Sequence, residues 1–313
     1  MVGTFDDIQI RRLLAKSFAG LAAVTWLLLI FGSTVRVHGA GLACPDWPLC
    51  FGEWVPQFNF QVFLEWGHRQ LAGVIGALFL VLSGATVLRP GLRREFGWHV
   101  VVLGVVLACQ IVLGGLTVLA LLASWSVTLH LLFGNAFMAL LIALAARLAA
   151  TGTALPVLRG ARFLGAALGG MVAVQLALGG LVSSNYAGLA CTEWPSCNGG
   201  VWFPTFTGIV GLQLAHRLGA YLLAAIVVGF AWLVRGSSRL RSPSRAIVML
   251  VVVQLLLGVS NVLLSMPVEL AIAHAAVAHA IVATTAVTLA RLFDRAGAVE
   301  IAAVAAAHVV KAR

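Results

Sequence analysis

The chain has 313 residues, of which 61% are hydrophobic and only 10% are charged, and its mean hydropathy is +1.04. So few charges exclude an ordinary soluble domain and place the chain among integral membrane proteins. The formal net charge of +10 does not indicate a nucleic-acid partner, because the basic residues follow a membrane topology, as shown below.

Eight apolar segments are long enough to cross a bilayer as helices, which takes about 20 residues each. They lie near residues 17–37, 65–88, 98–118, 127–150, 163–183, 210–234, 246–265 and 270–293. The first is too long for the apolar core of a signal peptide and lacks a clear cleavage site, so we expect it to remain as a spanning helix. The Ala-rich tail after Arg291 is expected to form a short helix.

The basic residues gather beside one end of the spans. Of the 20 Lys and Arg residues, only Arg36, Arg69 and Arg217 fall toward the other end. The positive-inside rule makes the basic face cytoplasmic, and eight spans place both termini there. Because no Arg- and Ser-rich transit segment precedes the spans, we predict a multi-pass protein of a bacterial plasma membrane, surrounded by membrane lipid.

The sequence contains a tandem repeat. Glu65-Trp66-Gly67-His68-Arg69 recurs 148 residues later as Gln213-Leu214-Ala215-His216-Arg217, and the loops 40–50 and 187–197 also match. Gln110 to Gly114 recurs at Gln254 to Gly258, at an offset of 144 that carries His130 onto His274. Four spans per unit give a parallel repeat. We therefore predict an all-α membrane protein of two four-helix bundles, residues 1–155 and 156–313, related by a pseudo-two-fold axis along the membrane normal.

Four histidines occupy equivalent places in this repeat. His68 and His216 lie near the outer start of the second and sixth spans, and His130 and His274 near the outer start of the fourth and eighth. Ionisable groups inside membranes are rare and tend to be functional. Two inward histidines on facing helices can hold one haem iron. The alternatives are packed, hydrogen-bonded histidines, or a zinc site, although zinc usually takes four ligands.

A fifth histidine, His279, competes with His274 for this role. The two lie five residues apart, about 140° around a helix, so both cannot face one iron. The repeat alignment selects His274. His38 and His99, near membrane edges, and His308, in the tail, are predicted not to be ligands.

An arginine follows the first histidine of each pair. Arg69 follows His68 and Arg217 follows His216. Since arginine binds carboxylates through two parallel hydrogen bonds, we predict that both pair with haem propionates. The alternative is that they extend to lipid headgroups.

Glu65 distinguishes the two copies, because the second copy has Gln213 at this position. Residues three apart share a helix face, so Glu65 is expected to point toward whatever His68 binds. A carboxylate there can move protons or stabilise a positive charge, whereas an amide cannot titrate. The alternative is a favourable charge at a helix start. The difference predicts a reactive first half and an electron-transfer or structural second half.

The two long outer loops each carry a pair of cysteines. Cys44 and Cys50 lie in the first loop, and Cys191 and Cys197 lie in the second. Because the outer side permits disulfides, we predict the pairs Cys44–Cys50 and Cys191–Cys197. A thiol–disulfide electron relay is an alternative role. Cys109, inside the third span, is expected to stay free as a small buried hydrophobe.

Taken together, these features resemble the haem A synthase family over residues 17–293. The resemblance rests on the eight spans, Glu65-x-x-His68-Arg69, Ala215-His216-Arg217, the two Gly-Leu-x-Cys-x-x-Trp-Pro loops, His130 and His274. It implies an oxidoreductase that converts the C8 methyl of haem O to a formyl group by successive hydroxylations, with loss of water from a geminal diol. The product, haem A, serves cytochrome oxidase.

The resemblance also assigns residues. It implies that the N-terminal half binds the substrate, haem O, near His68 and His130, with Glu65 as the essential acid. It implies that His216 and His274 ligate the iron of a haem b cofactor in the C-terminal half. Haem O synthase and an electron donor are candidate partners, and an oligomer is compatible with the sequence.

Two other classes of protein remain as alternatives. A diheme b-type membrane cytochrome that exchanges electrons with quinone also needs four histidines, but it leaves the difference between Glu65 and Gln213 unexplained. A transporter built from parallel repeats is expected to have broken helices with polar residues near the middle of the membrane, whereas the polar groups here gather at the outer edge.

Overall fold

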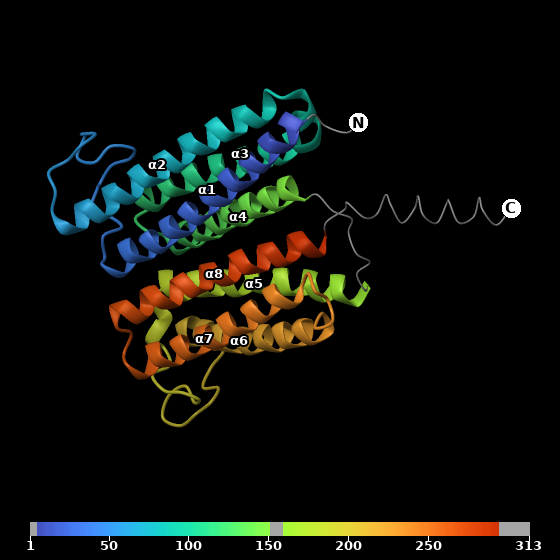
Figure 1. The fold of residues 1–313 in the computed structure, drawn as a ribbon. Coiled ribbons are helices and arrows are strands. Elements are labelled where there is room, and N and C mark those ends of the chain that lie inside the picture. The colour runs from blue at the N-terminus through green and yellow to red at the C-terminus, as the bar shows by residue number, and fades with distance from the viewer. Residues whose placement is uncertain (1–4, 151–158, 294–313) are drawn as a thin grey trace.

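The computed structural model describes residues 5–150 and 159–293, and within these ranges it contains eight long α-helices (Figure 1). They are α1 (Phe5–Val37), α2 (Phe60–Val87), α3 (Pro90–Leu119), α4 (Ser124–Ala149), α5 (Arg159–Ser184), α6 (Gly208–Leu233), α7 (Arg241–Leu263) and α8 (Val268–Leu292), with a short 3-10 helix η1 (Ala187–Leu189) after α5. All eight are long and apolar enough to cross a membrane, which confirms the predicted all-α class. The predicted tail helix, His308 and the predicted boundary at 155/156 lie outside the described residues.

Several helices begin before the apolar segments that predicted them. α1 begins at Phe5 rather than near residue 17, and α3 begins at Pro90 rather than near residue 98. An apolar segment marks only the part of a helix in hydrocarbon, whereas long arginine side chains let the helix continue into the interface. Proline is accommodated in the first turn, where its missing N–H would have no helical partner. Only Leu88 and Arg89 therefore separate α2 from α3.

The eight helices form two bundles with the same internal arrangement. In the first, α1 and α3 each pack against α2 and α4; in the second, α5 and α7 each pack against α6 and α8. The bundles meet where α4 packs on α8, flanked by contacts of α1 with α8 and of α4 with α5 (Figure 1). Exchanging each helix for its repeat partner leaves this set of contacts unchanged. The packing is therefore consistent with the predicted pseudo-two-fold axis.

Two contacts join residues that are equivalent in the repeat. His279 Nδ1 lies 3.0 Å from Asn135 Oδ1, and these residues are 144 positions apart. Arg36 donates a hydrogen bond to the carbonyl of Ser183, 147 positions away. These are the offsets that relate α4 to α8 and the first outer loop to the second. A residue meets its own equivalent only close to a two-fold axis, so both contacts are consistent with an axis passing between α4 and α8.

Each bundle has a packed core toward the end where the first helix begins. Phe18, Phe79 and Phe137 belong to the buried core of the first bundle, and the Phe79 and Phe137 rings meet edge to face with centroids 5.4 Å apart. Leu168 and Phe230 belong to the corresponding core of the second. The other half of each bundle, toward the long loops, contains the predicted histidines.

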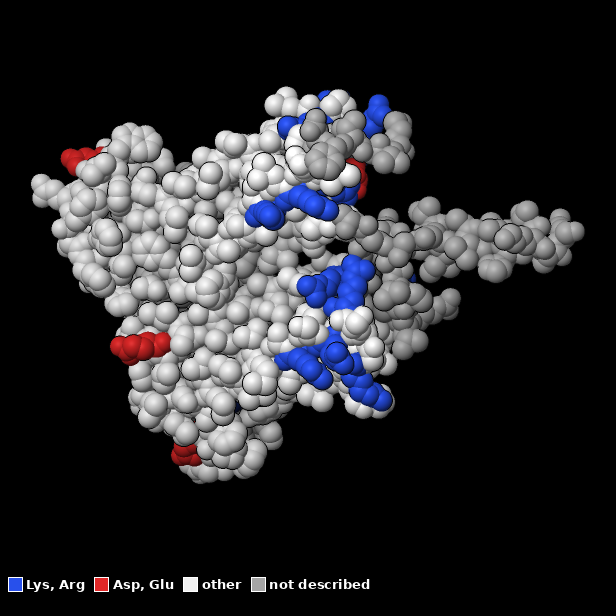
Figure 2. Space-filling model, in the orientation of Figure 1, with Lys and Arg blue, Asp and Glu red and all other residues white. Residues whose placement is uncertain are grey.

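Lys and Arg side chains gather at the end of the molecule where α1 begins, while acidic atoms are visible mainly at the opposite end (Figure 2). One ion pair lies at the basic end, where both guanidinium Nη atoms of Arg11 on α1 lie 2.9 Å from the carboxylate of Glu95 on α3. The same guanidinium also donates to the carbonyls of Arg147 and Leu148 at the end of α4. Arg11 therefore ties three helices together at this end.

Candidate functional site

The four predicted haem histidines lie at matched places in the two bundles. His68 and His216 lie eight residues after the first residues of α2 and α6, and His130 and His274 lie six residues after the first residues of α4 and α8. All four side chains are partly exposed. His68 on α2 and His130 on α4 belong to the first bundle, and His216 on α6 and His274 on α8 belong to the second. The fold therefore places one pair of histidines in each bundle.

Each of these imidazoles lies against a glycine on a neighbouring helix. A Cβ built on the glycine would lie between 3.0 and 3.3 Å from a ring atom. The pairs are Gly32 with His68, Gly114 with His130, Gly179 with His216, and Gly258 with His274. Larger side chains at these positions would displace the rings, so the glycines let each imidazole lie directly on a helix backbone. They recur at the repeat offsets and are site residues that the sequence analysis did not single out.

Two equivalent glutamines contact the histidines of α4 and α8. The Nε2 atom of Gln110, on α3, lies 3.4 Å from Nε2 of His130, and that of Gln254, on α7, lies 3.0 Å from Nε2 of His274. The Nδ1 atoms of both histidines are buried without a hydrogen-bond partner among the described residues. The matching segments that begin at Gln110 and Gln254 were visible in the sequence, but they served there only to align the repeat.

A third glutamine has no counterpart. The Nε2 atom of Gln175, on α5, lies 3.1 Å from Nδ1 of His216 and donates to the backbone carbonyl of the same residue at 2.8 Å. His68, the equivalent of His216, has no hydrogen bond from its ring to any described residue and instead lies edge to face with Phe31, with centroids 5.9 Å apart. The two halves therefore hold their equivalent histidines differently.

His279 lies apart from these pairs. Its side chain is only 1% exposed, and its contact with Asn135 places it at the interface between the bundles. Its Nε2 atom is buried without a partner in the described part of the chain. His274, five residues earlier, instead contacts Gln254 on α7 inside the second bundle. The two histidines thus face different surroundings, as their separation around the helix predicts.

Glu65 and Arg69 form a buried ion pair that holds the first outer loop. Arg69 Nη2 lies 2.5 Å from Glu65 Oε1, and the two side chains are 13% and 6% exposed. Glu65 Oε2 accepts the N–H of Cys44 at 2.8 Å. Arg69 donates to the carbonyls of Asp46 and Leu49 at 2.8 and 2.6 Å. In this structure both residues contact the loop, and pairing of Arg69 with a propionate stays a prediction.

The second half holds its loop with an arginine and an amide. Arg217 donates to the carbonyls of Ser196 and Cys191 at 3.0 and 3.1 Å. Gln213 donates to the carbonyl of Gly188 at 3.1 Å. The arginine is therefore satisfied by loop carbonyls without a carboxylate beside it. This difference shows that Glu65 is not needed merely to fold such a loop over the bundle.

The predicted disulfides Cys44–Cys50 and Cys191–Cys197 are both present, and Cys109 is free, as expected. Each loop is also closed by an equivalent carboxylate. Asp46 accepts the N–H groups of Phe51 and Gly52 at 2.7 and 2.8 Å. The loop backbone is thus fixed both by a covalent bond and by hydrogen bonds to a carboxylate.

Glu193 has the same role in the second loop. It accepts the N–H groups of Gly199 and Gly200, each at 3.0 Å, and the hydroxyl of Ser196 at 2.8 Å. The Gly200 N–H, helped by Ser196 and Gly199, lowers the pKa of the Glu193 carboxyl below its ordinary value. The Gly52 N–H, followed by that of Phe51, lowers the pKa of the Asp46 carboxyl in the same way.

These shifts predict a pH dependence for the first loop. Because the folded-state pKa of Asp46 lies below its ordinary value of 3.8, the carboxylate stabilises the loop fully above that pH and less as the pH falls through the folded value. We expect reduction of Cys44–Cys50 by a phosphine to accelerate in acid relative to Asp46→Asn, which has no carboxylate to titrate. Mass spectrometry of alkylated peptides measures both rates. A wild-type to variant ratio that stays constant with pH would contradict the role of Asp46.

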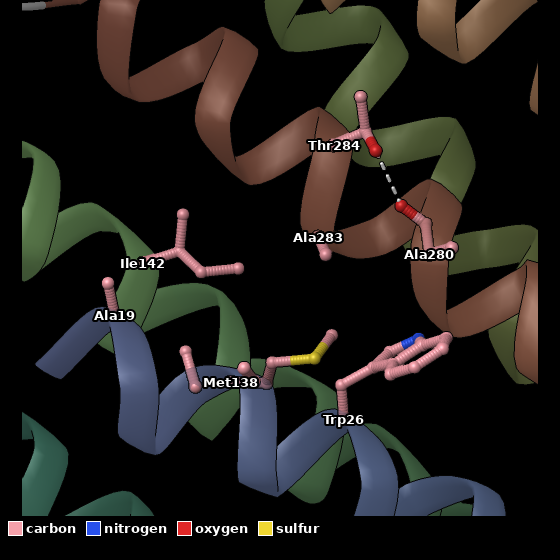
Figure 3. A pocket seen from close by; sticks show the side chains of 9 residues that line it. Ala19, Trp26, Met138, Ile142, Ala280, Ala283 and Thr284 are labelled. Carbon is pink, nitrogen blue, oxygen red and sulfur yellow. Dashed lines mark hydrogen bonds between the residues drawn. The ribbon is translucent and has the colours of Figure 1, made fainter.

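A cavity of about 300 Å³ lies away from the four histidines, between α1, α4 and α8 (Figure 3). Its lining is almost entirely apolar and includes Ala19, Trp26, Met138, Ala280 and Thr284. The Thr284 hydroxyl is satisfied by the carbonyl of Ala280 at 2.8 Å. None of the four histidines lines this cavity, so it is not the space between the histidine pairs.

The described residues contain no cluster of three or more His, Cys, Asp and Glu side chains arranged to hold a metal ion. Haem needs fewer protein ligands than a bare ion, because the porphyrin occupies most positions around the iron. Paired histidines on facing helices of a bundle are a common way to complete that coordination.

Comparison with known proteins decides the family. Residues 55–286 match the model of the COX15-CtaA family, described as "Cytochrome oxidase assembly protein". The chain belongs to the COX15-CtaA family. It is 30% identical over 296 residues to the heme A synthase of Shewanella oneidensis, covering 80% of this chain and 88% of that protein. It is 31% identical over 320 residues to the heme A synthase of Methylobacterium nodulans, covering 85% and 88%.

A third relative is slightly less similar in sequence. The heme A synthase of Halalkalibacterium halodurans is 28% identical over 271 residues, covering 83% of this chain and 91% of that protein. The family match begins before α2 and extends into α8, so it includes both pairs of histidines. Membership in the COX15-CtaA family therefore rests on both halves of the repeat.

Proposed function

We propose that this member of the COX15-CtaA family is a haem A synthase that converts haem O to haem A for cytochrome oxidase. The relatives named heme A synthase support this assignment over most of the chain. The observation that carries it is the pair of matched histidine sites. The carboxylate Glu65 stands three residues before His68, and the amide Gln213 stands at the equivalent position before His216.

The residues around the histidines fit a haem in each bundle. The glycines that face the rings let each imidazole lie directly against the backbone of a neighbouring helix. Buried polar atoms also concentrate there: Oε1 of Gln110, Gln175 and Gln254 and Nδ1 of His130 and His274 have no partner among the described residues. Unpaired buried polar groups cost free energy, so their concentration around both pairs supports sites that are completed by a bound group.

In the first bundle we assign the substrate, haem O, to His68 and His130. The methyl group is oxidised in successive hydroxylations to a geminal diol, which loses water to give the formyl group. Glu65 lies one helical turn before His68, where its carboxylate can accept or return a proton during these steps. Its ion pair with Arg69 and its hydrogen bond from the Cys44 N–H fix it beneath the disulfide loop.

In the second bundle we assign a haem b cofactor to His216 and His274. A bound haem b supplies one-electron redox chemistry. The protein residues in this half provide two imidazoles, the supporting glutamines Gln175 and Gln254, and no titratable group at position Gln213. This composition suits a permanent cofactor that does not itself exchange protons. Arg69 and Arg217 remain the candidates for pairing with propionates at the loop end of each bundle.

The distribution of charge supports an orientation. Basic residues at the end where α1 begins and α8 ends favour the cytoplasmic side of a bacterial plasma membrane for that end. The histidines and the disulfide loops then lie toward the outer side, where disulfides persist. Haem O synthase and an electron donor are candidate partners on chemical grounds. The first would supply the substrate, and the second would supply the electrons for hydroxylation by dioxygen, in which one oxygen atom enters the substrate and two electrons and two protons reduce the other to water.

Expression in a bacterium that makes haem O but has lost its own haem A synthase tests the function directly. We expect haem A to appear in the membranes, identified by chromatography of extracted haems. A matched culture expressing His68→Ala with His130→Ala controls for residual host activity. Full-length, membrane-inserted protein that yields haem O and no haem A would overturn the assignment.

A further inference from the structure

We propose that Gln175 is a positioning residue that makes the second-half haem resident, and that its absence from the first half leaves the substrate haem free to exchange. This inference rests on the proposed function, because it assumes one permanent and one transient haem. It starts from the contact of Gln175 with His216. Among the described residues, this is the one polar side-chain contact to the four paired histidines that is not repeated between the halves.

The repeat identifies what replaces Gln175 in the first half. The offset of 147 that aligns the outer loops also carries Gly32 onto Gly179 and Leu28 onto Gln175 without a gap. Leu28 is apolar and packs against the core of the first bundle. The ring of His68 consequently has no hydrogen-bond partner there among the described residues, although its neighbouring glycine is kept.

A second position changes together with the first. A Cβ built on Gly219, on α6, would lie only 2.4 Å from Oε1 of Gln175, so a larger residue there would exclude the carboxamide from its present position. The offset of 148 that relates α2 to α6 places Leu71 at the equivalent position. Leu71 packs against the same core as Leu28. The second half thus has a glutamine and the glycine that makes room for it, while the first half has two leucines.

The contact with Gln175 selects which nitrogen of His216 is available. The carboxamide contacts Nδ1 and is itself anchored on the backbone carbonyl of His216, so Nε2 is left as the nitrogen available to iron. In this structure the carboxamide NH2 group donates to both atoms, so Nδ1 is the acceptor. When Nε2 binds iron and Nδ1 carries the proton, the carboxamide keeps the contact by turning its oxygen toward Nδ1. In the first half, by contrast, Nε2 of His68 is the atom nearest to a Cβ built on Gly32.

Held in this way, His216 is oriented before iron binds. Hydrogen bonds to the second nitrogen of a ligating histidine fix its orientation and raise its basicity, and their loss typically costs about 10- to 100-fold in metal affinity. A resident cofactor benefits from this restraint. A substrate haem must leave as product, so a strong restraint on its histidine would slow its release. The unrestrained ring of His68 is compatible with that release.

The test uses purified full-length protein and measures haem release rather than haem A synthesis. Gln175→Leu makes the second half like the first, and Gln175→Glu keeps the length and an acceptor oxygen as the matched control. We expect Gln175→Leu to transfer haem b to apomyoglobin about 10- to 100-fold faster than wild type. Its midpoint potential should rise, because the ligand becomes less basic. Gln175→Glu should release haem more slowly than Gln175→Leu.

The proposal would be overturned if Gln175→Leu released haem b at the wild-type rate and had the wild-type midpoint potential. If that variant cannot be purified, Leu28→Gln with Leu71→Gly provides the reverse test: the first site should release added haem O more slowly, and unchanged release would overturn the proposal. Failure of the proposed function would be recognised separately, because cells that express the wild-type chain would then contain no haem A. Haem b release from Gln175→Leu does not depend on that synthesis.

Discussion

Replacing Glu65 by glutamine is expected to lower the conversion of haem O to haem A at least about 100-fold, the low end of the contribution of general acid–base catalysis. The substitution keeps the size of the side chain and an oxygen that can accept the Cys44 N–H, but it removes the titratable group. Partial loss of activity is expected to leave a hydroxymethyl product. The measurement is haem A per protein, by chromatography of haems extracted from a host without its own enzyme.

The structure explains why this variant should still fold. Breaking a buried ion pair by removing one partner often destabilises a protein by about 3 to 5 kcal/mol, which would otherwise confuse the result. The second half already combines an arginine with an amide at these positions, and there Arg217 is satisfied by loop carbonyls. Arg69 makes the same kind of contacts. Gln213→Glu is the control and should change activity far less. Near-normal haem A from Glu65→Gln would leave this residue only the role of holding the loop.

Replacing His216 or His274 by alanine is expected to abolish the spectrum of the resident b-type haem, because each substitution removes one of the two histidines that would hold its iron. Replacing His279 by alanine should retain that spectrum. The variant should lose the contact with Asn135, at a cost of about 1 to 3 kcal/mol for leaving the buried amide oxygen unpaired. The measurement is the haem absorbance of each purified variant, normalised to protein concentration. Haem lost from His279→Ala but retained in His274→Ala would show that the alignment of α8 assigns the wrong ligand.

The sequence predicted the number of helices and the two disulfides because these depend on strong local features. Apolar length alone identifies a spanning helix, and the placement of Cys44, Cys50, Cys191 and Cys197 in two matching outer loops identifies the disulfides. It did not predict where α1 and α3 begin, because interfacial turns contain charged residues that an apolar search leaves out. The ion pair of Glu65 with Arg69 was also missed, although residues four apart on a helix are neighbours.

The repeat was most informative where the two halves agree and least informative where they differ. It aligned His130 with His274 and indicated which of His274 and His279 lies beside the other histidine of its bundle. It gave no indication of Gln175, since an unmatched glutamine in an apolar helix has no recognisable pattern. The Gln175 carboxamide also needs the space that Gly219 leaves, and Gly219 lies 44 positions later in the sequence and on another helix.

The assignment of two different haems is tested by extraction and identification of the porphyrins bound to the purified protein. We expect haem b, retained through purification, and haem O or haem A in the exchangeable site. Replacing His216 by alanine should remove the first and spare the second. Two identical b haems would instead indicate a membrane cytochrome, and protein that contains no haem would contradict both histidine sites.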